Sequence, residues 1–169
     1  MRAWVWFDVG MKFGTRSLVA LMILLCTSFA WAGGKKEVAQ VSFHIETEGT
    51  DNPKMIFPYE LFGKQRFFRR LPEVSSRDFV AYSPFPSEDQ ASYGAVFQLK
   101  DNARRRLAAV TATSIGRWLV CHAFGRVIDG VMIDEAVDDG VIVVWRGLSL
   151  TEVQELDKAL PRIGEKKKK

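Results

Sequence analysis

The chain has 169 residues, with 24 lysines and arginines, 20 aspartates and glutamates, and a formal net charge of +4 at pH 7. A chain that starts at Gly33 keeps 21 basic and 19 acidic residues, and its last four residues are all lysines. Before this lysine tail (164–169) the protein is slightly acidic, so the high isoelectric point does not indicate a basic surface. The composition therefore disfavours a nucleic-acid partner, and the length after the N-terminal segment fits one domain.

Residues 1–32 have the layout of a cleavable signal peptide. Lys12 and Arg16 precede an apolar run that is shorter than the roughly 20 residues that span a bilayer. The small residues Ala30 and Ala32 occupy the positions that a signal peptidase reads. Cleavage is expected between Ala32 and Gly33. We expect an exported protein, in the periplasm or outside the cell, with no integral membrane span after cleavage. A start at Met11 gives a more ordinary signal than a start at Met1.

The pattern of residues 33–92 predicts a β-rich segment. Alternation in AQVSFHIETE predicts a first strand, with His44 on its polar, solvent-facing side. The following stretch predicts two short extended pieces, interrupted by Pro58 and Gly63. The stretch SSRDFVAYSPFPSED, which begins at Ser75, is expected to be mostly loop or a single turn because of its two later prolines.

The pattern of residues 93–163 predicts a second, α+β domain. A strand precedes a helix that is capped by Asp101 or Asn102 and ends at a glycine. Alternation in RWLVCHAFG predicts another strand, and two runs rich in valine and isoleucine predict two more. A capping box of Ser149 and Glu152 begins a final short helix. The fold class expected is α+β: a mixed, largely antiparallel sheet with two main helices packed on it.

Five carboxylates occur in the stretch GRVIDGVMIDEAVDDGVIVV: Asp129, Asp134, Glu135, Asp138 and Asp139. Most of them are adjacent pairs or stand beside glycines, as in turns, and they lack the alternate spacing of a calcium-binding loop. We therefore expect charged turns between strands. Paired carboxylates that catalyse hydrolysis are the alternative interpretation.

The only cysteine after the signal, Cys121, alternates with Leu119 and Ala123 and is predicted to be buried and structural. In a regular strand His122 points to the opposite face, so it is poorly placed as a base for this thiol. Two histidines are too few for a metal site without carboxylates, and the sequence has no phosphate-binding loop, zinc motif or serine-hydrolase elbow. We predict no catalytic residue, no metal and no cofactor.

A basic and aromatic stretch, GKQRFFRRLP, is a candidate binding patch. Its members are Lys64, Arg66, Phe67, Phe68, Arg69 and Arg70. Positive charge with aromatic stacking suits an anionic polymer or a phosphate group. The simpler interpretation is a strand whose phenylalanine enters the core while its arginines face solvent.

The order of elements in the C-terminal half resembles the head subdomain of the first periplasmic domain of SecD and SecDF, accessory subunits of bacterial protein export. The residues that carry the resemblance, between about Tyr93 and Leu160, are Thr111, Gly116, Gly125, Ile133, Gly140, Thr151 and Glu152. The resemblance implies the fold, an extracytoplasmic compartment and a capacity to contact polypeptides. SecD also has transmembrane helices with acidic residues for proton coupling, for which we expect no counterpart here, so the motor activity is not implied.

The function expected is therefore that of an exported, non-enzymatic accessory domain of the cell envelope. Its partner would be an envelope protein or a translocating polypeptide, and the oligomeric state is left open. Two alternatives remain: a small secreted hydrolase with its site between Asp129 and Asp139 or around His122, and the binding of an anionic polymer by the patch between Arg66 and Arg70.

Overall fold

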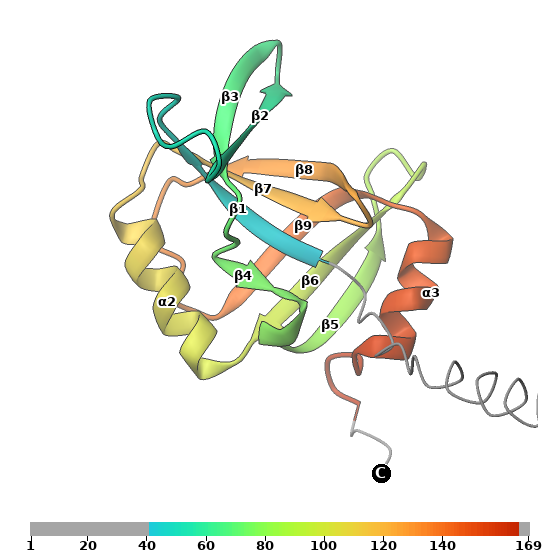
Figure 1. The fold of residues 1–169 in the computed structure, drawn as a ribbon. Helices are drawn as coiled ribbons and strands as arrows, with labels where there is room; N and C mark the ends of the chain where they lie inside the picture. Colours follow the sequence, from blue (N-terminus) through green and yellow to red (C-terminus); the bar gives the residue numbers. More distant parts are fainter. Residues whose placement is uncertain (1–40, 166–169) are drawn as a thin grey trace, which may run out of the picture. The chain divides into compact units, whose positions relative to one another are not determined.

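The computed structural model of the protein describes residues 41–165, which lie within one compact unit. They form two sheets flanked by the helices α2 and α3 (Figure 1). The expected cleavage residues Ala30, Ala32 and Gly33, and the last four lysines, lie outside the described residues. In the described part, no helix is both long and apolar enough to cross a membrane.

The first sheet has six strands in the order β2-β3-β1-β7-β8, with β4 paired beside β1. Its strands are β1 (Val41–Thr47), β2 (Ile56–Leu61), β3 (Lys64–Arg69), β4 (Val74–Ser75), β7 (Trp118–Ala123) and β8 (Arg126–Met132). β3 and β4 share one edge of β1, and β7 pairs with the other edge, where Val41 lies opposite Ala123 and Ile45 opposite Leu119. Strands from both halves of the chain therefore build one sheet.

The second sheet has three strands in the order β5-β6-β9. Its strands are β5 (Phe79–Pro86), β6 (Tyr93–Leu99) and β9 (Val141–Leu148). The helical elements are η2 (Ser76–Asp78, a short 3-10 helix), α2 (Asp101–Ala112) and α3 (Leu150–Ala159). The ladders between these strands, like those of the first sheet, are antiparallel, which confirms the predicted α+β class. β8 ends the first sheet and β9 ends the second, and these two strands lie side by side without a ladder between them.

The main core lies between the two sheets and the helices. Both sheets contribute aromatic rings: Phe43 of β1 contacts Phe79 and Phe97 edge-on, with ring centroids 6.3 and 6.2 Å apart. The helices contribute Leu107 and Leu156, which are fully buried. Because buried apolar area stabilises a fold by roughly 25 cal/mol per Å², this shared core is the main force that holds the two sheets together.

A second, smaller cluster lies on the opposite face of the first sheet, beneath the hairpin of β2 and β3. Its buried members are Leu61, Phe68 and Val120, and four half-buried side chains pack against them: Phe57, Tyr59, Trp118 and Val127. The hairpin therefore covers a face of β1 and β7 that a single-layer sheet would leave in solvent.

The periodicity arguments predicted β1, β6, β7 and both main helices correctly. The capping box of α3 is present, since the Ser149 N–H donates to Glu152 (2.8 Å) and the Glu152 N–H donates to Ser149 (3.3 Å). The cap of α2 differs from the prediction. Its N-cap is Lys100, which makes no side-chain capping bond, and Asp101 lies in the first turn of the helix.

The expectations based on proline were wrong. Pro58 lies inside β2, and the stretch expected to be loop contains β5, an eight-residue strand that includes Pro84 and Pro86. Both β2 and β5 are edge strands. A proline lacks an N–H and is tolerated at an edge because the missing donor faces no partner strand.

Tyr82 connects β5 to α3. Its side chain is fully buried, and its hydroxyl lies 3.0 Å from the Val153 carbonyl oxygen and 2.5 Å from Asp157 Oδ1. Burial and the nearby Asp157 carboxylate raise the pKa of Tyr82 well above its ordinary value. On the same carboxylate, hydrogen bonds from Arg162 lower the pKa of Asp157. The helix is therefore joined to the second sheet by a polar link as well as by its apolar face.

The close approach of β9 to β8 requires glycine at position 147. Gly147 has a φ of +98°, and a Cβ there would lie 2.7 Å from the Ile128 carbonyl oxygen, whereas Gly63, with a φ of +71°, has open space around it.

Replacing these two glycines by alanine should destabilise the protein to different extents. The left-handed backbone alone should make Gly63→Ala cost about 1–2 kcal/mol of unfolding free energy. Gly147→Ala should cost roughly 1–3 kcal/mol more because of the clash. Urea unfolding of both variants measures this difference, and equal destabilisation would contradict it.

Candidate functional site

The predicted basic and aromatic patch is split between the two faces of β3. Phe68 is fully buried under the hairpin, as the simpler interpretation of the patch expects. Phe67 points to the other face and lies against Gly49, where a Cβ would come within 2.7 Å of its ring. Arg66 shares the face of Phe68, whereas Arg69 shares that of Phe67. The six residues therefore do not form one continuous binding surface.

Carboxylates accompany two of the patch arginines. Arg66 lies 2.6 Å from Glu46 and stacks over the Trp118 ring, with its guanidinium carbon 5.3 Å from the ring centroid. Arg69 lies 3.4 Å from Glu73. These pairs reduce the positive potential that an anionic polymer would meet. Binding of an anionic polymer by the patch stays a prediction. The exposed basic side chains of the patch are Lys64, Arg69 and Arg70.

The two histidines of the described chain face one another in a cavity of about 520 Å³, which is lined by Ser42, His44, Phe57, Arg70, Pro72 and His122. The ring centroids of His44 and His122 are 6.0 Å apart. The prediction that His44 faces solvent was wrong, because the β2–β3 hairpin covers this face and leaves the residue only 7% exposed.

His44 makes two hydrogen bonds that fix its ring. Its Nδ1 lies 2.7 Å from the Arg69 carbonyl oxygen, so Nδ1 carries the proton and donates it. In the neutral ring Nε2 then accepts from the Ser42 hydroxyl at 2.8 Å. This geometry is that of a serine beside a potential base. It also serves a structural purpose, since it satisfies both nitrogens of a buried ring and joins β1 to the last residue of β3.

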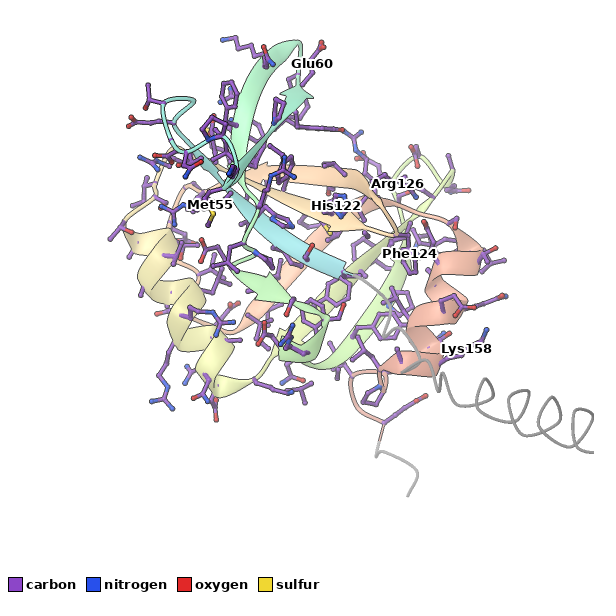
Figure 2. The ribbon with its side chains drawn as sticks, in the orientation of Figure 1. Met55, Glu60, His122, Phe124, Arg126 and Lys158 are labelled. Carbon is purple, nitrogen blue, oxygen red and sulfur yellow. The ribbon has the colours of Figure 1, made fainter. Side chains whose placement is uncertain are left out.

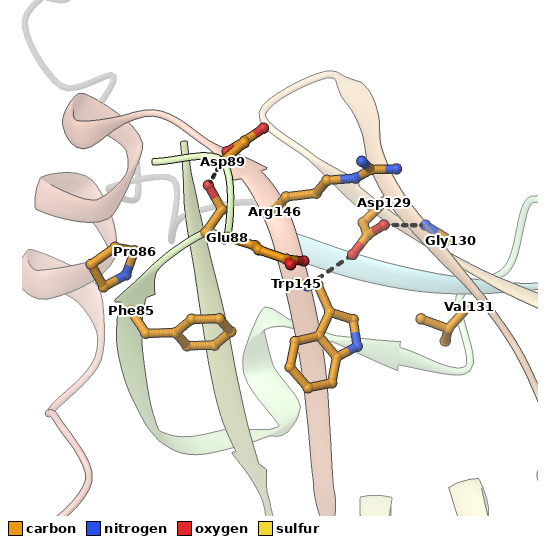
Figure 3. A pocket seen from close by; sticks show the side chains of 10 residues that line it. Phe85, Pro86, Glu88, Asp89, Asp129, Gly130, Val131, Trp145 and Arg146 are labelled. Carbon is orange, nitrogen blue, oxygen red and sulfur yellow. Dashed lines mark hydrogen bonds between the residues drawn. The ribbon is translucent and has the colours of Figure 1, made fainter. Parts of the chain in front are cut away.

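Two adjoining cavities follow the line where β8 and β9 meet, and together we call them the β8–β9 groove. The first, of about 680 Å³, is lined by Phe85, Pro86, Ser87, Glu88, Asp89, Asp129, Gly130, Val131, Trp145 and Arg146 (Figure 3). The second, of about 580 Å³, shares Val131 and Trp145 with the first and continues along the connection between the two strands. Trp145 is 60% exposed, and its ring lies edge-on to Phe85 at 6.1 Å.

Asp129 links the two strands inside this groove. Its Oδ1 accepts from the Gly130 N–H of β8 (2.9 Å), and its Oδ2 accepts from the Trp145 N–H of β9 (2.8 Å), as Figure 3 shows. The expectation that this residue belongs to a charged turn was wrong, since it lies within β8 beside a bulge opposite Cys121. One carboxylate therefore satisfies two backbone donors that an ordinary strand pair would satisfy with carbonyl groups.

The other four acids do lie in the connection between β8 and β9, as predicted: Asp134, Glu135, Asp138 and Asp139. Asp139 accepts from the Val141 N–H at 2.9 Å, an ordinary Asx turn. In residues 41–165, histidine, cysteine and carboxylate side chains form no group of three that could hold a metal ion. The acids line the second cavity of the groove rather than converging on one point.

Cys121 is buried, as predicted, and is only 2% exposed in the main core. Burial raises the pKa of the Cys121 thiol far above its ordinary value, and the Asp129 charge adds to this effect. The thiol is therefore held in its neutral, unreactive form. At the turn between β7 and β8, where Figure 2 labels Phe124 and Arg126, Arg126 forms an ion pair with Glu152 of α3 at 2.9 Å.

Protonation of His44 should weaken the fold. Burial lowers the pKa of His44 from its ordinary value of 6.5, the bond to the Arg69 carbonyl partly opposes this, and His122 adds a smaller lowering effect. The unfolded chain then binds more protons than the folded chain as the pH falls below about 6.5, so the free energy of unfolding should decrease there.

Urea unfolding between pH 4.5 and 7.5 measures this slope. His44→Gln should flatten it, whereas His122→Gln should keep most of it because the charge of His122 is the smallest of the three effects on the His44 pKa. A wild-type stability that stays constant across this pH range would contradict the assignment.

Removing the Asp129 carboxylate should destabilise the protein. Asp129→Ala leaves two backbone donors without their acceptor, which should cost about 1–3 kcal/mol. Asp129→Asn keeps one acceptor oxygen and should cost less. The control is Asp134→Ala, at an exposed position outside the strands, which should change stability by no more than about 0.5 kcal/mol. Thermal unfolding of the three variants checks the order, and a neutral Asp129→Ala would contradict it.

Comparisons with known proteins support the fold. No family model and no curated protein matches the sequence. Among solved structures, one of the membrane component SecDF that enhances protein export matches with a TM-score of 0.52 and 15% identity, over 94% of this chain and 77% of that chain. SecDF in its super-membrane-facing form matches with a TM-score of 0.48 and 18% identity, over 72% of this chain and 18% of that chain. The first likeness confirms, at the level of the fold, the resemblance to the SecD head.

Proposed function

We propose that this chain is an exported, non-enzymatic accessory domain of the cell envelope that binds polypeptide partners. The observation that carries the proposal is the β8–β9 groove, an open and largely apolar groove with the exposed side chain of Trp145, on a SecDF-like fold. Large exposed aromatic side chains in concave, apolar surfaces are typical of protein-binding sites. The export role named for SecDF supplies the class of partner.

Hydrolysis is the competing function, and one arrangement could support it. Ser42 and His44 lie within hydrogen-bonding distance, and His44 is oriented by a backbone carbonyl. However, the Ser42 hydroxyl also lies 3.4 Å from the His122 carbonyl oxygen, within the ladder that joins β1 to β7. We interpret this serine as a structural partner of a buried histidine.

The proposal is tested in cells that express the full chain with a C-terminal tag. N-terminal sequencing of the protein from the envelope fraction should begin at Gly33. Cross-linking in living cells should then capture exported polypeptides before they fold, because unfolded chains present the apolar segments that the groove can bury. Trp145→Ala should reduce this capture at least tenfold, whereas the triple variant Arg66→Gln, Arg69→Gln, Arg70→Gln should leave it unchanged.

Three results would contradict the proposal. Retention of residues 1–32 would argue against export as expected here. Labelling of Ser42 by a fluorophosphonate in the folded protein, lost in His44→Gln, would establish an active nucleophile and favour the hydrolase. Loss of capture in the arginine triple variant, with Trp145→Ala unaffected, would move the binding surface to the β3 patch.

A further inference from the structure

The facing edges of β8 and β9 carry backbone groups that no neighbouring strand pairs. In β9, Ile142 and Val144 lie opposite Phe97 and Ala95 of β6, and the Leu99 N–H donates to the Gly140 carbonyl. The backbone N–H and C=O groups of every second residue, Gly140, Ile142 and Val144, therefore point toward β6. Val143 and Trp145 therefore direct their N–H and C=O groups toward β8. Such an edge can accept an added extended chain.

Side chains, and not strands, satisfy two of these edge donors. Asp129 accepts from the Trp145 N–H and Asp139 accepts from the Val141 N–H. Val143 lies in the middle of this row. The β9 edge is thus kept from collapsing onto β8 while remaining accessible from the groove, and its central residue offers one N–H and one C=O in the direction of an incoming chain.

The walls of the groove are apolar on both sides of Asp129. Trp145 and Phe85 form an aromatic wall in the first cavity, and Val131 reaches both cavities. In the second cavity Met132 is 54% exposed, close to buried side chains of the main core. Large apolar side chains of a ligand would find contact area at both positions.

Acidic residues dominate the polar lining of the groove. The first cavity has three carboxylates and one guanidinium: Glu88, Asp89, Asp129 and Arg146. The second has four carboxylates and no basic residue: Asp134, Glu135, Asp138 and Asp139. The groove therefore complements a ligand with positive charge, and at short range such complementarity decides between ligands of equal apolar area.

We propose that the β8–β9 groove binds an extended polypeptide segment that carries lysine or arginine together with large apolar side chains. The segment lies along the β9 edge, its backbone pairs with Val143, and its side chains occupy the cavities on either side of Asp129. This inference rests on the proposed function, which supplies polypeptide as the ligand, and adds the site, the conformation and the charge. The outward-facing part of β9, Val141–Trp145, spans about 16 Å, so about five residues of ligand suffice.

The test uses protein purified from cells that express the full chain, and fluorescence polarisation of labelled 12-residue peptides. The first peptide alternates leucine and lysine. The second replaces lysine by glutamate, and the third keeps the lysine sequence but is N-methylated at alternate residues, which removes strand-forming donors. We expect the lysine peptide to bind at least tenfold more tightly than either matched peptide. Its affinity should also fall as the salt concentration rises, because screening weakens contacts with exposed carboxylates.

Variants of the groove locate the site. Trp145→Ala should weaken binding of the lysine peptide at least tenfold, and Trp145→Phe should weaken it less. The paired change Asp134→Asn and Glu135→Gln should weaken it several-fold and flatten the salt dependence. Met55→Ala is the control, because Met55 is similarly exposed (53%) but lines neither cavity. It should leave the affinity unchanged.

Several outcomes would overturn the inference. They are equal affinity for the lysine and glutamate peptides, equal affinity for the N-methylated peptide, and no effect of Trp145→Ala. Self-association that Trp145→Ala abolishes, without peptide binding, would show that a second copy of the chain occupies the groove. If no peptide binds but cross-linking in cells still captures unfolded polypeptides, the inference fails and the proposed function stands. If the lysine peptide binds as expected but nothing is captured in cells, the proposed function fails instead.

Discussion

The facing edges of β8 and β9 require hydrogen-bond partners, and the Asp129 carboxylate supplies one to each. If carbonyl groups supplied them, the two sheets would merge into one continuous surface. Because a side chain supplies them, the two sheets stay separate, and they share the main core. Gly147 then allows β9 to approach the β8 backbone again, beyond the carboxylate. The first cavity of the groove lies at this junction, with Asp129 in its lining.

The location of the groove relates the fold to the proposed role. In this SecDF-like fold the edge strands of the two sheets, β8 and β9, lie next to each other. The exposed ring of Trp145 lies at the boundary between them. The β2–β3 hairpin, which carries the basic patch, covers the outer face of the first sheet instead. The chain therefore carries its basic hairpin and its acidic groove on separate surfaces. A ligand whose charge complements one of them does not complement the other.

Local patterns predicted most of the elements, because alternation and capping depend on nearby residues. His44 shows the limit of this reasoning. Alternation assigned it to the polar face of β1 correctly, but only the hairpin that folds over β1 determines that this face is also buried. Asp129 could not be assigned from its neighbours, because its second partner, the Trp145 N–H, belongs to another sheet. The prolines of β2 and β5 misled for a similar reason, since edge positions are a property of the whole sheet.

The central position of β1 has a consequence for the order of folding. β1 is the first described strand, yet five of its residues pair with β7, which lies more than seventy residues later in the sequence. The first sheet cannot be completed until most of the chain is available, and contacts of such long sequence separation form slowly. A newly made chain should therefore stay unfolded for longer than a helical protein of the same size. That delay leaves more time for recognition by factors that require an unfolded substrate.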